Sequence, residues 1–213
     1  MDLRNIDVVY LHGTHKPERK EHMEKTLFDL NAKCHIGVSD QGRKSGVMGM
    51  IEILKKRLND HFKPFLLLED DCSRTKWFRY TLSIPADTDA VYVGLSVYGI
   101  HPYIPQGYPN LVSWTQVSDE PELVKLKNML STHAILFVSQ RWTEMCLQCF
   151  EKTLASVPGS GNCDYDILLC RSLPLFNTYA LRKPLFYQDK IVGGCEDATY
   201  IEFKGENEIL CVT

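Results

Sequence analysis

The sequence lacks any apolar run close to the roughly 18 residues that would indicate a membrane-spanning helix. It also begins without the basic and apolar regions of a signal peptide. We therefore expect no membrane span and a cytoplasmic protein. An excess of positive charge is missing as well, since the formal net charge is −3. Nucleic-acid-binding proteins usually carry a basic stripe, so we expect no nucleic-acid partner.

Several catalytic motifs are absent too. The sequence contains no GxxxxGK[ST], no HExxH, no GxSxG and no GxGxxG after its first apolar segment. These absences disfavour an ordinary P-loop ATPase, a zinc protease, a serine hydrolase and a dinucleotide-dependent dehydrogenase. Cysteine is present eight times, and without a secretory signal we expect reduced thiols. Cys146 and Cys149 repeat at helical spacing with Trp142 and Phe150, which predicts buried core positions rather than a redox or zinc pair.

Apolar segments and amphipathic segments alternate along the first half of the chain. Strands are expected at 6–12, 33–39, 64–69 and 90–96, and helices from Pro17 onward and at 47–62. This order predicts an α/β fold with a mostly parallel central sheet flanked by helices. We expect one domain spanning residues 1–213.

The second half is less regular. A long aromatic loop is expected at 97–121, a strand at 131–139, the cysteine-bearing helix after it, and another helix at 163–173. Further strands at 182–189 and 198–213, the last forming a hairpin, predict a small antiparallel C-terminal part.

Three consecutive carboxylates, Glu69, Asp70 and Asp71, directly follow the apolar segment PFLLL. The carboxyl ends of parallel strands meet at one sheet edge, where ligands bind. We therefore expect residues 12–14 and 39–40, which end the first two strands, to converge on the triplet. Clustered carboxylates repel one another unless water or a cation screens them. Mg²⁺ and Mn²⁺ take oxygen ligands and often combine one or two protein carboxylates with substrate phosphates. The triplet thus predicts Mn²⁺ or Mg²⁺ with a diphosphate substrate.

Three segments carry a family resemblance: VVYLHGTHKPERKEHMEKTL, SGVMGMIEILKKRL and PFLLLEDDC. In order and spacing they resemble the GT-A glycosyltransferases of the lipopolysaccharide/procollagen galactosyltransferase type. HAILFVSQRW and YDILL resemble a later strand and helix start of that family, whereas SGVMGM lacks its Ser-His pair. The chain also resembles the N-terminal glycosyltransferase domain of large chlorella-virus proteins.

The resemblance implies a GT-A (Rossmann-like) fold and a metal-dependent, inverting transfer of a sugar from UDP-glucose, UDP-galactose or UDP-rhamnose. The implied acceptor is a glycan or glycoprotein, which would be a capsid protein if the viral likeness holds. Asp71 is the implied chief metal ligand, and Asp70 the residue near the donor sugar. Further metal contacts are expected from Glu69, Gln188 and Asp189. The expected nucleotide-binding residues are Leu11, His12, Gly13, Thr14, Arg19, Ser39, Asp40, Glu69 and Asp70.

Acceptor activation needs a base, for which Asp166 and Asp164 are the candidates. Asp166 fits the family spacing better, and Asp164 fits a helix N-cap at least as well. Aromatic side chains that could stack on a sugar are Tyr98, His101, Tyr103 and Trp114. The same residues could instead pack their loop against itself.

Two other functions stay open on the sequence alone. One is a metal-dependent phosphohydrolase or nucleotidyltransferase that uses the same acidic triplet. The other is a non-catalytic nucleotide-sugar-binding module.

Overall fold

The computed structural model describes residues 1–37, 43–101, 103, 107–109, 111–156, 165–194, 200–205 and 208–212. Its helices are α1 (Pro17–Thr26), α2 (Arg43–Asn59), α3 (Gln140–Ser156) and α4 (Tyr165–Ser172), with short 3₁₀ turns η1 (Leu3–Asn5), η2 (Leu173–Leu175) and η3 (Lys190–Val192). Its strands are β1 (Asp7–His12), β2 (Ala32–Ile36), β3 (Phe65–Glu69), β4 (Cys72–Arg74), β5 (Ala90–Tyr92), β6 (Tyr98–Ile100), β7 (Gly107–Pro109), β8 (Ser113–Gln116), β9 (Leu123–Asn128), β10 (Ala134–Phe137), β11 (Thr178–Leu181), β12 (Phe186–Gln188), β13 (Tyr200–Lys204) and β14 (Glu208–Val212).

The central sheet has eight strands in the order β2-β1-β3-β10-β5-β11-β9-β8. Strands β2, β1, β3, β5, β11 and β8 run in one direction, whereas β10 and β9 run against them. The expected α/β fold with a mostly parallel central sheet is therefore confirmed. The C-terminal antiparallel hairpin, β13 with β14, is confirmed as well.

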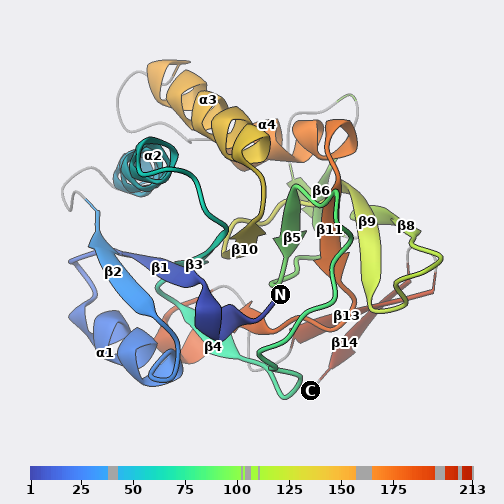
Figure 1. Cartoon of the computed structure of the whole chain (residues 1–213), viewed down its shortest axis with the longest axis horizontal. Helices are drawn as coiled ribbons and strands as arrows, with labels where there is room; N and C mark the ends of the chain where they lie inside the picture. Colours follow the sequence, from blue (N-terminus) through green and yellow to red (C-terminus); the bar gives the residue numbers. More distant parts are fainter. Residues whose placement is uncertain are drawn as a thin grey trace.

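Helices cover both faces of this sheet. In Figure 1, α2, α3 and α4 lie on one side and α1 lies on the other. Side chains of β3 alternate between the two layers, because successive residues of a strand point to opposite faces. Leu67 packs in the core under α2 and α3, while Leu66 and Leu68 pack in the core that includes Met23 of α1.

Some sequence-based expectations for local structure were wrong. The expected loop at 97–121 contains three short strands, β6, β7 and β8. Strands β4, β9 and β11 were not expected, because none of them contains a long apolar run. Strand pairing supplied by neighbours stabilises such segments, and this is a tertiary effect.

The cysteine-bearing helix is confirmed as α3. Cys146 is buried, Cys149 is partly buried, and both are free thiols. Among the described residues, no helix is both long enough and apolar enough to cross a bilayer.

Candidate functional site

The acidic triplet lies where β3 ends and the chain turns into β4. Glu69 is the last residue of β3, and Asp70 and Asp71 form the turn before Cys72. Strand β4 pairs antiparallel with β12, and the amide of Asp189 donates to the carbonyl of Asp71 at 2.7 Å. The segment after β12 is thereby placed beside the triplet.

Asp70 connects the triplet to the end of β1. Its Oδ2 accepts from His12 Nδ1 and from the amide of Gly13, both at 2.9 Å. Its Oδ1 accepts from Arg19 Nη1 at 2.7 Å. The predicted convergence of the first strand end on the triplet is therefore confirmed for these residues. Because three donors occupy the carboxylate of Asp70, it anchors this loop and is not directed at a donor sugar, in contrast to the expectation.

Arg19 is held by the fold on every edge of its guanidinium. Nε donates to the carbonyl of Val192 at 2.8 Å, and Nη2 donates to that of Gly193 at 2.7 Å. Nη1, besides contacting Asp70, lies 3.3 Å from Asp71 Oδ2. The side chain is only 11% exposed. Arg19 was expected to bind phosphate. In the structure its contacts instead join α1 to Asp70, Asp71 and residues 192–193.

Glu69 accepts hydrogen bonds from two other segments. Thr132 Oγ1 donates to its Oε1 at 2.7 Å, and Gln188 Nε2 donates to its Oε2 at 3.3 Å. Burial raises the pKa of Glu69 to about 7, and the charge of Asp71 adds to the rise, while the Thr132 hydrogen bond opposes it. This carboxyl therefore changes its protonation state near neutral pH.

Asp71 is the unusual member of the triplet. Its side chain is 8% exposed, and its buried Oδ1 has no hydrogen-bond partner. Burial raises the pKa of Asp71, Arg19 opposes the rise, Asp70 adds to it, and a hydrogen bond from the side chain of Gln188 to this carboxyl opposes it. A buried carboxylate oxygen without a donor destabilises the fold, so it is the atom of this site that most needs a ligand.

Asp189, unlike Asp71, has a hydrogen-bond donor at each of its carboxylate oxygens. Its Oδ1 accepts from the amide of Ile191 at 2.9 Å and so caps η3. Its Oδ2 accepts from Ser73 Oγ at 2.8 Å and from Tyr187 OH at 3.2 Å. Both oxygens are thus used inside the fold, and the expected metal role of Asp189 is replaced by a structural one. Gln188, by contrast, does reach the triplet.

The oxygen atoms gathered here are of the chemical type that hard divalent cations take as ligands. Asp71 would be the chief protein ligand of a cation such as Mg²⁺ or Mn²⁺, with Glu69 and Gln188 nearby. Among the described residues, no three His, Cys, Asp or Glu side chains are grouped to hold a metal ion by themselves. Water or substrate oxygens would therefore have to complete the coordination.

Comparisons with known proteins give little further guidance. No family model and no curated protein matches the chain. A solved structure described as a glycosyltransferase involved in the glycosylation of the major capsid of PBCV-1 is 9% identical, with a TM-score of 0.47, covering 86% of this chain and 92% of that one. The structure of A197 from STIV is 11% identical, with a TM-score of 0.43, covering 96% and 93%. At TM-scores below 0.5, these likenesses carry no inference about fold or activity.

The other expected nucleotide-binding residues are Leu11, Thr14, Ser39 and Asp40. Leu11 packs toward α2, because a Cβ added to Gly49 would lie 2.5 Å from its Cδ1. The side chain of Leu11 is therefore partly buried against α2, whereas Thr14 is exposed. Ser39 and Asp40 lie outside the described residues.

The expected acceptor residues divide into two groups. Trp114 is 1% exposed and stacks on Phe203 with ring centroids 4.1 Å apart, so it is a core residue and its expected acceptor role is wrong for this conformation. Tyr98 and Tyr103 are 49% and 88% exposed, and the ring of His101 lies against Tyr103. These three stay candidates.

Asp166 lies in the first turn of α4, where its Oδ1 accepts from the amide of Ile167 at 2.9 Å. Asp164 lies outside the described residues. Helix α4 packs against β6, and the carbonyl of Tyr98 in β6 accepts from the amide of Leu130 at 2.9 Å. The chain then continues to Thr132, which contacts Glu69. Residues 130–132 thus connect the acceptor candidates to the acidic triplet.

Two contributors were missed by the sequence analysis: Thr132 and the carbonyls of Val192 and Gly193. Thr132 carried no signal of its own, since it fell inside the strand expected at 131–139. The glycine pair at 193–194 was a usable signal, since Gly193 adopts φ 82°, a conformation that favours glycine.

Proposed function

We propose that this protein is a metal-dependent glycosyltransferase that moves a sugar from a UDP-sugar to a glycan acceptor. The observation that supports this most directly is the buried, unpartnered Oδ1 of Asp71 at the carboxyl edge of the parallel strands. That edge is where α/β sheets bind nucleotides. The sequence resemblance to GT-A glycosyltransferases supports the choice of UDP-sugar over other diphosphates.

In this proposal Asp71 holds Mn²⁺ or Mg²⁺, with Glu69 and Gln188 beside it. When bound, the cation supplies Lewis-acid stabilisation of the charge that develops on the leaving diphosphate. Asp70 and Arg19 act on the protein side: they hold residues 12–13 and 192–193 around the acidic turn. A rigid frame of this kind preorganises the site before substrate arrives.

Acceptor activation is assigned to Asp166 as the general base, with Tyr98 as the sugar-stacking side chain. Support comes from the packing of α4 on β6 and from the connection of β6 to the triplet through residues 130–132. A base that takes the acceptor proton fits inversion by in-line displacement.

The experiment is to incubate the protein with UDP-glucose, UDP-galactose or UDP-rhamnose and Mn²⁺, with and without glycan acceptors, and to measure UDP release. Wild-type protein should release UDP only when Mn²⁺ or Mg²⁺ is present. Asp71→Asn should abolish both this release and metal-dependent UDP binding in titration calorimetry.

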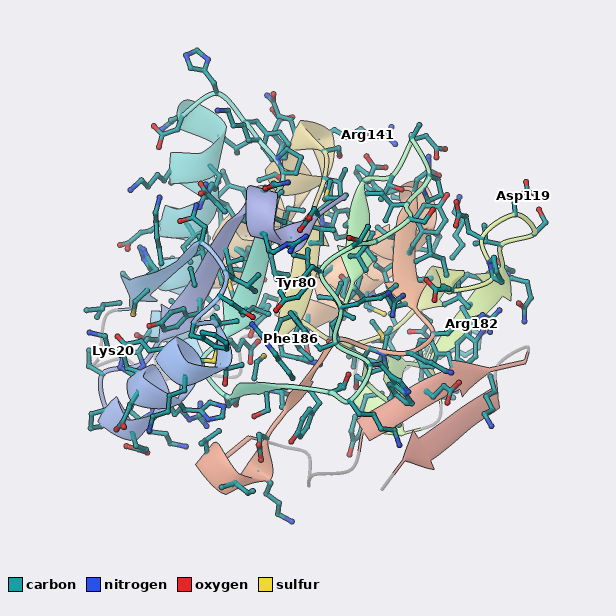
Figure 2. The ribbon with its side chains drawn as sticks, turned by 60° about the horizontal axis from the view of Figure 1, so that its bottom comes forward. Lys20, Tyr80, Asp119, Arg141, Arg182 and Phe186 are labelled. Carbon is teal, nitrogen blue, oxygen red and sulfur yellow. The ribbon has the colours of Figure 1, made fainter. Side chains whose placement is uncertain are left out.

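Asp119→Asn is the matched control, because Asp119 is an exposed carboxylate on the connection between β8 and β9, far from α1 in Figure 2. It should behave as wild type. Unchanged UDP binding by Asp71→Asn would reject the site. Pyrophosphate release from nucleoside triphosphates would favour a nucleotidyltransferase, and UDP-sugar binding without any turnover would favour a binding module.

A further inference from the structure

Arg19 places a permanent positive charge against both aspartates of the proposed site. Its Nη1 lies 2.7 Å from Asp70 Oδ1 and 3.3 Å from Asp71 Oδ2. An arginine side chain does not lose its proton in proteins, so this charge is present at every working pH. The two oxygens of Asp71 therefore have different surroundings: Oδ2 faces the guanidinium, and Oδ1 has no partner.

The geometry also prevents the guanidinium from moving away easily. Nε and Nη2 are engaged by the carbonyls of Val192 and Gly193, and the side chain is 11% exposed. Moving Arg19 would leave those two carbonyls and Asp70 without their donor. A buried polar group that loses its partner destabilises the protein. The positive charge is thus built into the site.

A free divalent cation that approaches Asp71 Oδ1 must come close to this guanidinium. The guanidinium weakens the attraction of the acidic residues for that cation, because charges are poorly screened where the groups are buried. A cation that is already bound to a diphosphate brings compensating negative charge with it. The guanidinium of Arg19 therefore opposes the approach of this metal–diphosphate complex much less than that of the free cation.

We infer that Arg19 is a positioning residue that makes the site select a divalent cation bound to a nucleoside diphosphate over the free cation. This inference rests on the proposed function. It predicts that metal and nucleotide bind with strong positive coupling, and that the coupling depends on the charge of residue 19. Such coupling is reciprocal, so it can be measured from either ligand.

The test is to measure Mn²⁺ affinity by electron paramagnetic resonance at one fixed pH, with and without UDP. Wild-type protein should bind free Mn²⁺ weakly and bind it far more tightly with UDP. Arg19→Gln should bind free Mn²⁺ about tenfold or more tightly than wild type, because one nearby positive charge is removed. The coupling between Mn²⁺ and UDP should fall by the same factor.

Two further variants separate charge from structure. Arg19→Lys keeps the charge but loses the planar fork, so its free Mn²⁺ affinity should stay within about threefold of wild type even if its melting temperature falls. Lys20→Gln removes a neighbouring charge on the outer side of α1, shown in Figure 2, and should change nothing. Should Arg19→Gln not fold, Arg19→Met provides the same neutral test with a similar stem.

The outcomes are distinguishable. If folded Arg19→Gln or Arg19→Met binds free Mn²⁺ no more tightly than wild type, while wild type still binds Mn²⁺ with UDP, this inference is wrong and the proposed function stands. If wild type binds no Mn²⁺ even with UDP, or Asp71→Asn binds it equally well, the proposed function itself fails.

Discussion

Replacing Asp71 by asparagine should stabilise the metal-free protein while removing its response to metal. The carboxylate is buried next to Glu69 and Asp70, and its Oδ1 has no donor. Burial and the neighbouring charge of Asp70 both raise the pKa of Asp71, so its ionised form destabilises the metal-free fold. The substitution keeps the shape of the side chain and removes the charge.

The loss of the ion pair with Arg19 should lower the stability of Asp71→Asn, which opposes the gain. At 3.3 Å it is the longest ion pair of that guanidinium, which retains Asp70 and the carbonyls of Val192 and Gly193. We therefore expect Asp71→Asn to gain about 1–2 kcal/mol in the free energy of unfolding, because a disfavoured buried charge is removed. For a chain of this length, that corresponds to a melting temperature about 2–8 °C higher.

Ligand should reverse the order of the two proteins. At a concentration of Mn²⁺ and UDP about 100 times the dissociation constant, wild type gains about 2.7 kcal/mol by mass action. Asp71→Asn should gain nothing. Thermal and urea unfolding with EDTA, and then with Mn²⁺ and UDP, measure both effects, with Asp119→Asn as control. A metal-free Asp71→Asn protein that is less stable than wild type, or one that keeps the ligand-induced shift, would refute the reasoning.

Four further substitutions test other residues of the site and of the fold. Because the pKa of Glu69 is raised from 4.5 to about 7, the metal-free protein should lose stability as pH rises between these two values, and Glu69→Gln should flatten this dependence in urea unfolding. Gly94→Ala should destabilise the fold by about 1–3 kcal/mol, because the added Cβ would lie 2.1 Å from His133 Nε2. Gly46→Ala meets no atom within 4 Å and should instead stabilise α2 by up to about 1 kcal/mol in the same thermal assay. Asp166→Asn should bind Mn²⁺ and UDP as wild type does but lose acceptor-dependent sugar transfer; normal turnover would exclude it as the base.

Several features of this protein were already determined by its sequence. The alternation of apolar strands and amphipathic helices predicted an α/β fold, because period-2 and period-3.6 patterns bury different faces. The position of Glu69, Asp70 and Asp71 directly after a buried strand predicted a site at the carboxyl edge. The contacts of Asp70 with His12 and Gly13 confirm that the end of β1 meets the triplet.

Residue roles within that site were not predictable in the same way. Asp70 and Asp189 are carboxylates like Asp71, yet hydrogen bonds from distant segments occupy their oxygens. Trp114 follows a stretch rich in Tyr, Pro and Gly and was expected to meet an acceptor, but Phe203 of the C-terminal hairpin covers it.

The position of the site could be predicted from the sequence and the roles of its residues could not, for a physical reason. A hydrophobic period is a local property, so a short window of sequence is enough to indicate which face a segment buries. Whether a polar atom is satisfied depends on donors that arrive from other segments, such as Arg19 from α1 or Ile191 from the loop after β12. Sequence alone therefore determined where the acidic groups gather, and only the tertiary structure decided that Asp71 Oδ1 is left without a donor.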